Sequence, residues 1–502
     1  MTQRGASAQA PDPAQGPDPA PAPDSAQSPD AAPEQVGATA LAELAAALGE
    51  ALVRDPAALD LARADKSGHR ASAAPLALVE ARSIDDVSAT LRIANAHGIP
   101  VVPRGGGSGL AGGAIAGEGE LVLSLRGMDR ILEIDPVEQL AVVEAGVVNA
   151  DLDAAARAQG LFFAPDPASR ALATVGGNVA TNAGGLACVA YGVTREAVLG
   201  LTVVLADGTV LETGRRTAKG VTGLDLTALM VGSEGTLGVV VRATVRLRRV
   251  PEGDPATVRA AFDGVGAAAR AATAILAAGV APAALELLDA GSLEAIVELL
   301  GPVDAAGLEG AGALLLVRTD GPDAAVRAEF AARVCADAGA SVEVAADPAE
   351  GERLFAARRA FHPALEARGT VLIEDVAVPR SRLPEMFAAL ERIARETGIP
   401  IPTVAHAGDG NLHPNFVLPA PEPGAGDAGG DAAEVPAEVW AAADAVFRAA
   451  LELGGTLTGE HGVGTLKRRW LADELGDDAV ALQRRIKAAF DPNGILNPGK
   501  AI

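Results

Sequence analysis

The pattern of hydrophobic and polar positions changes near Pro251, from one dominated by strands to one in which helices alternate with short strands. Helical spacing covers residues 39–64, and a second helix is expected to begin at Ser83, whose hydroxyl can cap it ahead of two acidic residues. Strands then take a large share of the chain as far as Pro251. Beyond that point, helical stretches alternate with short apolar strands such as Leu314–Val317 and Thr370–Ile373. The pattern predicts two domains, the second of which mixes helices with strands.

Turn residues and alternation predict several individual elements. Asp207-Gly208 lies between two runs rich in branched residues, which is typical of a hairpin turn. Val241–Arg248 alternates apolar and polar positions, as a half-buried strand does. A helix at Phe355–His362 is expected to precede a strand over Val371–Val378.

Three glycine-rich stretches interrupt the strands of the first domain. The first, Gly105–Gly109, follows the strand-like Ile99–Arg104, and its glycines satisfy the dinucleotide-binding pattern Gly-x-Gly-x-x-Gly. No amphipathic helix follows it, whereas a Rossmann site needs a helix N-terminus beneath the pyrophosphate. Backbone N–H groups in so open a loop can still cradle an anion, and a loop with only a turn role is the alternative.

The second and third stretches, residues 175–185 and 232–238, favour the anion cradle. Small residues dominate the second, and its Asn and Thr side chains can hydrogen-bond the edge of a planar ligand. Three such loops, each close to a strand, predict one extended cofactor that carries phosphate.

Composition excludes several classes of protein. The 502 residues carry a net charge of −24, which argues against nucleic-acid binding because that needs a basic face. The uncharged run at residues 171–194 is too polar to span a bilayer, and the apolar run at 271–285 is too short. Two cysteines, Cys188 and Cys335, cannot build a disulfide framework or an iron–sulfur cluster.

Low-complexity segments flank and interrupt the predicted domains. Residues 1–35 are rich in Pro, Ala, Asp and Ser and contain no signal-peptide core, so we expect a disordered segment on a cytoplasmic protein. Peripheral association with a membrane partner stays open. Residues 419–436 are expected to form a solvated surface loop.

The chemistry is concentrated in two histidine motifs. His406 ends a strand-like run and His413 begins another, with the tight-turn residues 408–411 between them, so a hairpin can bring both imidazoles to one face. Glu460 and His461 lie between glycines that let the backbone enter a crowded site. Two imidazoles and a carboxylate suit a borderline divalent ion, and a nearby histidine suits proton abstraction. Surface turns are the alternative, and structural or surface roles are expected for the other histidines: His69, His97 and His362.

These motifs resemble known flavoproteins. Pro103–Gly109 together with Gly176-Gly177-Asn178-x-x-Thr181-Asn182-Ala183-Gly184-Gly185 is similar to the FAD-binding domain of the vanillyl-alcohol oxidase type. The C-terminal half resembles the FAD-linked D-2-hydroxyacid dehydrogenases, which include the glycolate oxidase catalytic subunit, FAD-linked D-lactate dehydrogenases and D-2-hydroxyglutarate dehydrogenase. That likeness is carried by three motifs: His406–His413, Gly459–Gly464 and Asp491–Lys500.

The resemblance implies an α+β fold. A vanillyl-alcohol-oxidase/p-cresol-methylhydroxylase-type FAD-binding domain would be joined to an α/β cap domain with a mainly antiparallel sheet. We expect residues 1–36 to be disordered, 37–251 to form the FAD-binding domain, 252–480 to form the substrate or cap domain, and 481–502 to return to the FAD domain.

The resemblance also implies site residues. Arg358 would bind the substrate carboxylate, and His461 would take the hydroxyl proton while a hydride leaves C2 for flavin N5. His406, His413 and Glu460 would hold a divalent ion (Zn, Mn or Fe) that lowers the pKa of the 2-hydroxyl. The first glycine loop has Ser108 and lacks the histidine with which some relatives tether the flavin, so we expect non-covalent FAD. The expected FAD contacts are Pro103, Arg104, Gly105, Gly106, Gly107, Ser108, Gly109, Pro165, Asp166, Thr174, Gly177, Asn178, Thr181, Ala183, Gly184, Glu234, Gly238, Val240 and Asn497.

The resemblance leaves the substrate open. D-2-hydroxyglutarate enzymes carry a basic residue near the strand at Val371–Asp375, and this chain has none, which favours D-lactate or glycolate. The alternatives are a D-2-hydroxyglutarate dehydrogenase, a non-redox enzyme like the alkyl-glycerone-phosphate synthases, a flavin-free metal-dependent hydrolase, and a subunit that binds FAD for assembly only. The electron acceptor or acceptor protein stays open, as does a homodimer.

Overall fold

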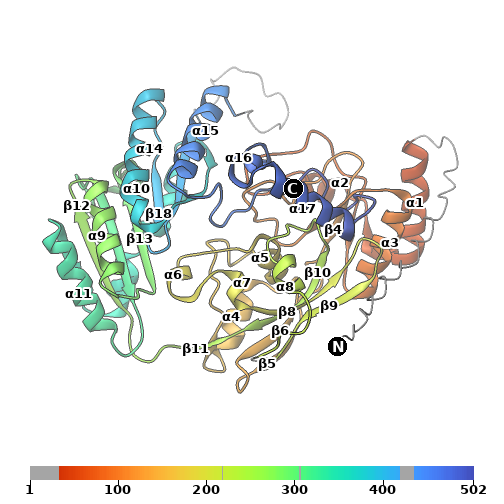
Figure 1. Cartoon of the computed structure of the whole chain (residues 1–502), viewed down its shortest axis with the longest axis horizontal. Coiled ribbons are helices and arrows are strands. Elements are labelled where there is room, and N and C mark those ends of the chain that lie inside the picture. Colours follow the sequence, from red (N-terminus) through yellow and green to blue (C-terminus); the bar gives the residue numbers. More distant parts are fainter. Residues whose placement is uncertain (1–32, 218, 305–306, 419–434) are drawn as a thin grey trace, which may run out of the picture.

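The computed structural model describes residues 33–217, 219–304, 307–418 and 435–502. Figure 1 shows two groups of elements, with the first half of the chain on one side and residues from about 256 onward on the other, while the last helix returns to the first group. No helix in the described ranges is long and apolar enough to cross a membrane. The predicted disordered segment up to residue 32 and the insert at 419–434 lie outside the described residues; Pro33 already begins a helix.

The N-terminal part of the chain builds a small sheet in the order β1-β2-β4-β3, in which only the β1–β2 pair is antiparallel. Helix α3 begins at the predicted cap: Ser83 Oγ accepts from Asp86 N, and the Asp86 carboxylate accepts from Ser83 N. The predicted helix over residues 39–64 is broken into two, because Gly49 takes a left-handed conformation (φ 54°). The elements are α1 Pro33–Leu48, β1 Leu52–Val53, α2 Pro56–Ala62, β2 Ala77–Glu80, α3 Ile84–His97, β3 Val101–Arg104 and β4 Leu121–Ser124.

A second, wholly antiparallel sheet follows in the order β5-β6-β10-β8-β9. The Asp207-Gly208 turn joins β8 to β9, as predicted. The strands are β5 Ile131–Asp135, β6 Leu140–Glu144, β8 Val198–Val204, β9 Val210–Gly214 and β10 Val239–Arg246, with the short pair β7 Leu161–Phe162 and β11 Arg248–Arg249 beside them. The helices between them are α4 Asn149–Arg157, α5 Val175–Thr181, α6 Cys188–Tyr191, α7 Thr194–Ala197 and α8 Leu226–Met230.

The second half of the chain is built on a third sheet, in the order β15-β12-β14-β13-β18-β19-β16, with β17 also paired to β19. Every pair in it is antiparallel, as predicted. The predicted hairpin at His406–His413 is the β18–β19 turn. The strands are β12 Ala256–Phe262, β13 Ala284–Asp289, β14 Ala313–Thr319, β15 Ser341–Val344, β16 Thr370–Ile373, β17 Val376–Ala377, β18 Thr403–His406 and β19 Asn411–Leu418.

Helices cover both faces of this sheet because its strands alternate between them. In β14, Leu315 and Val317 join one core with α9, α11, α14 and α15, whereas Leu314 and Leu316 join another with α10 and α13. The helices are α9 Val265–Ala277, α10 Ala290–Asp304, α11 Ala324–Asp337, α12 Pro348–Leu354, α13 Ala356–Glu366, α14 Leu383–Thr397 and α15 Ala437–Glu452.

The strand predicted over Val371–Val378 is wrong, because the chain breaks it into β16 and β17 at Glu374 and Asp375. Both carboxylates are buried there, next to the amino group of Lys467. A strand interior has no place for two adjacent buried acids, so the chain turns to bring both toward one cation.

The last residues cross back to the N-terminal part. After α16 Leu471–Leu475 and α17 Asp477–Phe490, Ile495 accepts a backbone hydrogen bond from Val101 N, and Asn497 N donates to Val101 O. Ile495 and Leu496 are buried in the core of the first sheet. The C-terminal segment thereby extends the sheet that ends in the first glycine loop.

Candidate active site

A cavity of about 840 Å³ lies between the glycine-rich loops and the second half of the chain. Of the residues expected to bind FAD, metal or substrate, all line this cavity except Pro165 and Asn497. Pro165 lies behind the wall, where its carbonyl accepts from the Asn149 amide at 2.9 Å. The structure therefore brings together residues that are separated by up to about 350 positions in the sequence.

The first glycine loop leaves β3 and presses against the segment before α5. A Cβ on Gly105 would lie 2.4 Å from Thr174 Oγ1, and a Cβ on Gly106 would lie 2.1 Å from the Leu172 carbonyl oxygen. Beneath the loop, the Arg104 guanidinium donates to the Ala114 and Ala64 carbonyl oxygens at 2.7 and 2.9 Å. The glycines are needed for this close approach, and Arg104 supports the loop through its backbone.

The second glycine-rich block forms a short helix, α5, which the sequence did not predict. Thr174 caps it by accepting from Gly177 N at 3.2 Å, and Asn178 accepts from the Asn149 amide at 3.0 Å. Beyond the helix, Gly184 approaches the histidine motif so closely that a Cβ would lie 2.5 Å from Glu460 Oε2. The block therefore joins the glycine-loop wall of the cavity to its histidine wall.

The third block holds Glu234 in a left-handed conformation (φ 50°). Its buried carboxylate accepts from Val463 N and Gly464 N, both at 2.8 Å, and burial raises the pKa of this carboxyl. Its carbonyl oxygen accepts from the Asn497 amide at 2.8 Å. Asn497, although it does not line the cavity, ties the C-terminus to the loop that does.

The β18–β19 hairpin brings His406 and His413 to one face, with ring centroids 5.0 Å apart. Glu460 Oε1 lies 3.5 Å from His406 Nε2 and 3.2 Å from His413 Nε2. Both histidines are almost fully buried. Burial alone would raise the pKa of Glu460, but the two imidazoles hold it well below its usual value. The structure thus brings together the two imidazoles and the carboxylate that the sequence analysis grouped as candidate metal ligands.

Two buried carboxylates that the sequence analysis missed stand behind these rings. Glu286 Oε1 lies 2.7 Å from His406 Nδ1, and Asp375 Oδ1 lies 3.8 Å from His413 Nδ1. Burial would lower the pKa of His406, but the Glu286 and Glu460 carboxylates raise it well above its usual value. The only sequence signal for Glu286 is that it stands alone as an acid within the apolar run Ala283–Leu288.

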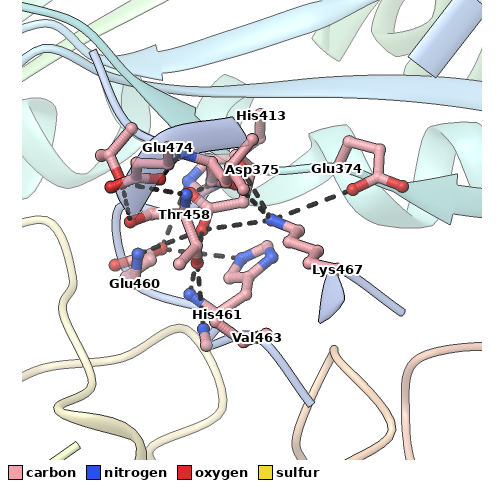
Figure 2. Close-up of polar contacts among 12 residues, drawn as sticks. Glu374, Asp375, His413, Thr458, Glu460, His461, Val463, Lys467 and Glu474 are labelled. Atoms are coloured by element: carbon pink, nitrogen blue, oxygen red, sulfur yellow. Dashed lines mark hydrogen bonds and ion pairs between the residues drawn. The ribbon is translucent and has the colours of Figure 1, made fainter. Parts of the chain in front are cut away.

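Asp375 also shapes the turn that carries His461 (Figure 2). Its Oδ2 accepts from Thr458 Oγ1, Glu460 N and His461 N at 2.5, 3.1 and 3.0 Å. The His461 ring stacks on His413 with centroids 4.9 Å apart. Burial lowers the pKa of His461 to about 4, against the opposing pull of Asp375, so this imidazole is neutral at physiological pH and able to accept a proton.

Lys467 completes the buried group in Figure 2. Its amino group donates to the Asp375 and Leu457 carbonyl oxygens at 2.8 and 3.0 Å, and it lies 3.8 Å from the Glu374 carboxylate. Burial raises the pKa of Glu374 to about 7. The structure thus places one lysine between two acids behind the histidine wall.

Arg358 is buried on α13, and its Nε donates to Glu286 Oε2 at 2.7 Å. His362 lies one turn further along the same helix and also lines the cavity; burial and the neighbouring Arg358 lower its pKa to about 3. The sequence predicts only a structural or surface role for His362. Arg359 is exposed and paired with Glu352 at 3.1 Å.

The donor set fits a divalent ion. His406, His413 and Glu460 offer two imidazole nitrogens and one carboxylate oxygen within 4.8 Å of one another, as do Asp375, His413 and His461. Nitrogen and oxygen donors of this kind suit Zn²⁺, Mn²⁺ or Fe²⁺. Carboxylates behind two of the rings are the usual partners of metal-bound imidazoles. The cavity of about 840 Å³, one wall of which is built of small residues, is likewise suited to a dinucleotide.

Comparison with known proteins agrees with this geometry. Residues 254–501 match the family described as FAD linked oxidases, C-terminal domain, and residues 75–214 match the FAD binding domain. The chain is 42% identical to the glycolate oxidase subunit GlcD of Bacillus subtilis (strain 168) over 85% of this chain and 88% of that protein. It is 36% identical to a D-lactate dehydrogenase of Anaerostipes hadrus over 85% of this chain and 90% of that one. The p-cresol methylhydroxylase structure superposes with a TM-score of 0.75 at 18% identity, over 93% of this chain and 97% of that one.

The fold is therefore that of the vanillyl-alcohol-oxidase/p-cresol-methylhydroxylase type, with a C-terminal domain built on an antiparallel sheet. The chain belongs to the FAD-linked oxidase family and is an FAD-dependent oxidoreductase similar to the glycolate oxidase and D-lactate dehydrogenase proteins.

Proposed function

We propose that this protein oxidises a small D-2-hydroxyacid, D-lactate or glycolate, to the 2-oxoacid. The observation that carries the proposal is the juxtaposition of Arg358, which can grip a carboxylate, with the neutral His461 in one cavity that the glycine loops also line. The glycolate oxidase and D-lactate dehydrogenase names of two relatives support this substrate class.

The residues divide the work according to their chemistry. Arg358 binds and orients the substrate carboxylate, because a guanidinium can form two parallel hydrogen bonds to it. His461 removes the hydroxyl proton, for which its neutral ring is suited. FAD, held without a covalent bond, would supply a hydride acceptor. His406, His413 and Glu460 would hold a divalent ion, which would supply a Lewis acid for the 2-hydroxyl.

A monocarboxylate fits the wall of the cavity better than a dicarboxylate. Ile373, at the end of β16, lines the cavity, and the segment Val371–Asp375 around it has no basic residue that could bind a second carboxylate. Arg318 and Arg359 line it too, but both are paired with Glu352, at 2.8 and 3.1 Å. These two arginines keep D-2-hydroxyglutarate as the second candidate substrate.

An anaerobic absorbance titration with D-lactate, L-lactate, glycolate and D-2-hydroxyglutarate tests the proposal. We expect the visible band of the oxidised flavin to bleach with D-lactate or glycolate, because a reduced cofactor reports hydride transfer directly. The matched control is Arg353→Gln, which removes an exposed arginine that pairs with Glu350 at 2.9 Å and does not line the cavity. Arg358→Gln should weaken substrate binding strongly, and Arg353→Gln only slightly. A yellow protein that none of the four acids reduces would refute the proposal.

A further inference from the structure

One buried carboxylate contacts both halves of the proposed site. Glu286 lies in β13 with none of its surface exposed. Its Oε1 is 2.7 Å from His406 Nδ1, and its Oε2 accepts from Arg358 Nε at 2.7 Å. A single side chain therefore holds one expected metal ligand and the expected substrate anchor.

The fold puts Glu286 there through two regularities. The alternation of β13 turns Ala284, Glu286 and Leu288 toward the core that contains α13, the helix of Arg358. The antiparallel register of β13 and β18 sets Glu286 directly opposite His406. Neither contact is local, because the partners lie 72 and 120 residues away in the sequence.

Each contact leaves its partner in the state that the chemistry needs. A carboxylate can only accept, so Glu286 holds a proton on His406 Nδ1 and leaves Nε2, on the side of Glu460, as the nitrogen that would give up its proton to bind a metal. On Arg358 it occupies Nε alone. Within the described parts of the chain the two terminal nitrogens of Arg358 make no hydrogen bond, and the residue lines the cavity, so both can bind a carboxylate.

We propose that Glu286 is a positioning residue that fixes both the tautomer of His406 and the orientation of the Arg358 guanidinium. The binding of a metal ion and the binding of a carboxylate then both depend on this one side chain. The Arg358 half of this proposal rests on the proposed function. The His406 half rests only on the donor set of His406, His413 and Glu460.

Two variants separate the two contacts. In Glu286→Gln the amide has one oxygen and one NH₂ group; the oxygen can still accept from Arg358, but the NH₂ group then faces His406 Nδ1, which must accept. The proton of His406 moves to Nε2 and blocks its lone pair. Glu286→Leu removes both contacts. Glu144→Gln is the matched control, because Glu144 is also a buried strand glutamate paired with an arginine, Arg130 at 2.7 Å, but does not line the cavity.

The measurements use the flavin-loaded protein and two probes. Zn²⁺ affinity is measured by chelator competition, and propionate affinity by the change in flavin absorbance, because propionate has the carboxylate but no hydroxyl for a metal. For Glu286→Gln we expect the Kd for Zn²⁺ to rise about 10- to 100-fold, the usual effect of losing a carboxylate behind a metal-bound histidine, with propionate affinity within about threefold of wild type. For Glu286→Leu both affinities should fall at least about tenfold.

Several outcomes would overturn the proposal. If both variants bind Zn²⁺ and propionate as the wild type does, Glu286 positions neither group. If both Glu286 variants only lower the yield of folded, flavin-loaded protein, and Glu144→Gln lowers it equally, the role of Glu286 is structural. A wild type that oxidises no 2-hydroxyacid refutes the proposed function but leaves both binding tests of Glu286 intact.

Discussion

Gly106 shows why the glycine loops need glycine. A Cβ on this residue would lie 2.1 Å from the Leu172 carbonyl oxygen, which is backbone and cannot swing aside. We therefore expect Gly106→Ala to separate the two loops, to destabilise the protein by about 1–3 kcal/mol as overpacking does, and to lower the flavin content of the purified protein. Thermal unfolding and the ratio of flavin to protein absorbance measure the two effects.

Gly117→Ala is the matched control in the same connection between β3 and β4. Its Cβ would meet Ala71 Cβ at 3.4 Å, an ordinary contact, and Gly117 does not line the cavity. We expect this variant to keep both its flavin and its stability. Equal flavin content and equal stability in the two variants would contradict the close packing of the loops.

The pair Glu374 and Asp375 makes the stability of the protein depend on pH. The amino group of Lys467 lies near both carboxylates. Asp375 accepts three hydrogen bonds, whereas Glu374 Oε1 has no partner among the described residues. Burial accordingly raises the pKa of Glu374 from 4.5 to about 7. Between these values the folded protein holds a proton that the unfolded chain releases, so stability falls as pH rises, by at most about 1.4 kcal/mol per pH unit.

Glu374→Gln should remove the contribution of Glu374 to this slope, because the amide cannot ionise. The buried carboxyls Asp166, Asp289 and Asp409, whose pKa values burial also raises, keep their own contributions. We expect urea unfolding at pH 5 and pH 8 to differ less in the variant than in the wild type. The exposed Glu50 provides the control, since Glu50→Gln changes the same functional group at the surface. A variant that keeps the wild-type slope would assign the pH dependence to other groups.

Single residues were predictable where a motif carried them and not otherwise. His406, His413, Glu460, His461 and Arg358 lie in stretches whose composition or resemblance predicts chemistry, and the structure gathers all five around one cavity. Their roles stay predictions. Glu286 and Asp375 have no motif, because their partners come from other elements and only the register of the strands brings them together.

Among the elements, the β18–β19 hairpin fixes the histidine pair through its turn. Gly410 has a φ of 88°, and a Cβ there would lie 2.1 Å from the Val378 carbonyl oxygen. We expect Gly410→Ala to push the hairpin away from the segment after β17 and to move both imidazoles. The rate of flavin reduction by the hydroxyacid should fall at least about tenfold, since misplacement by about 1 Å can cost 100-fold.

Gly398→Ala, at the end of α14, is the control that adds backbone strain without pushing a neighbouring segment away. Gly398 has a similar φ of 73°, but a Cβ there meets nothing within 4 Å. Gly398→Ala should therefore lose only about 1–2 kcal/mol for the left-handed backbone and keep its rate of flavin reduction. If both variants reduce flavin equally fast, the hairpin position does not govern the site.

Elements with strong local signals were predicted correctly, and those that depend on packing were not. The two capping residues of α3 are close to each other in the sequence, and so are the residues that form the β8–β9 turn. In both cases the local sequence is enough to predict the element. Helix α5 was missed because Gly176 and Gly177 are poor helix formers, by about 1 kcal/mol each relative to alanine. Glycine is needed here for close tertiary packing, because a Cβ on Gly176 would lie 2.6 Å from Ala145 Cβ.

At the scale of the whole molecule, the charge of the cavity differs from that of the chain. The net charge is −24, yet Arg104, Arg170, Arg318, Arg358 and Arg359 all line the cavity. Local arginines can attract an anionic substrate despite an acidic surface, because exposed charges are screened within about 10 Å at moderate salt. The overall charge of the chain therefore does not predict the sign of the charge in the site.

The C-terminal segment closes the molecule, and Asn497 is the residue that secures it. Its amide donates to the carbonyl oxygens of Gly113 and Glu234 at 3.0 and 2.8 Å, and its φ is 43°, which asparagine tolerates better than alanine. Asn497→Ala would leave the buried carbonyl of Glu234 and the half-buried carbonyl of Gly113 without this donor and add backbone strain. We expect a loss of about 2–4 kcal/mol in the free energy of unfolding, together with weaker retention of flavin.

Asn493 lies four residues earlier, in the same motif, but is exposed, and within the described ranges its side chain has one hydrogen-bond partner, the half-buried Asn95. Asn493→Ala should therefore change stability by less than about 0.5 kcal/mol. Urea unfolding and flavin release on dilution measure both variants. Glu234, whose carbonyl oxygen accepts from Asn497, also accepts hydrogen bonds from Val463 N and Gly464 N through its carboxylate, so it connects the C-terminal segment to the turn of His461. Asn497→Ala should therefore both release flavin and shift the turn of His461, which lowers the rate of flavin reduction. Flavin loss without a fall in that rate would mean that the glycine-loop wall and the histidine wall of the cavity are independent.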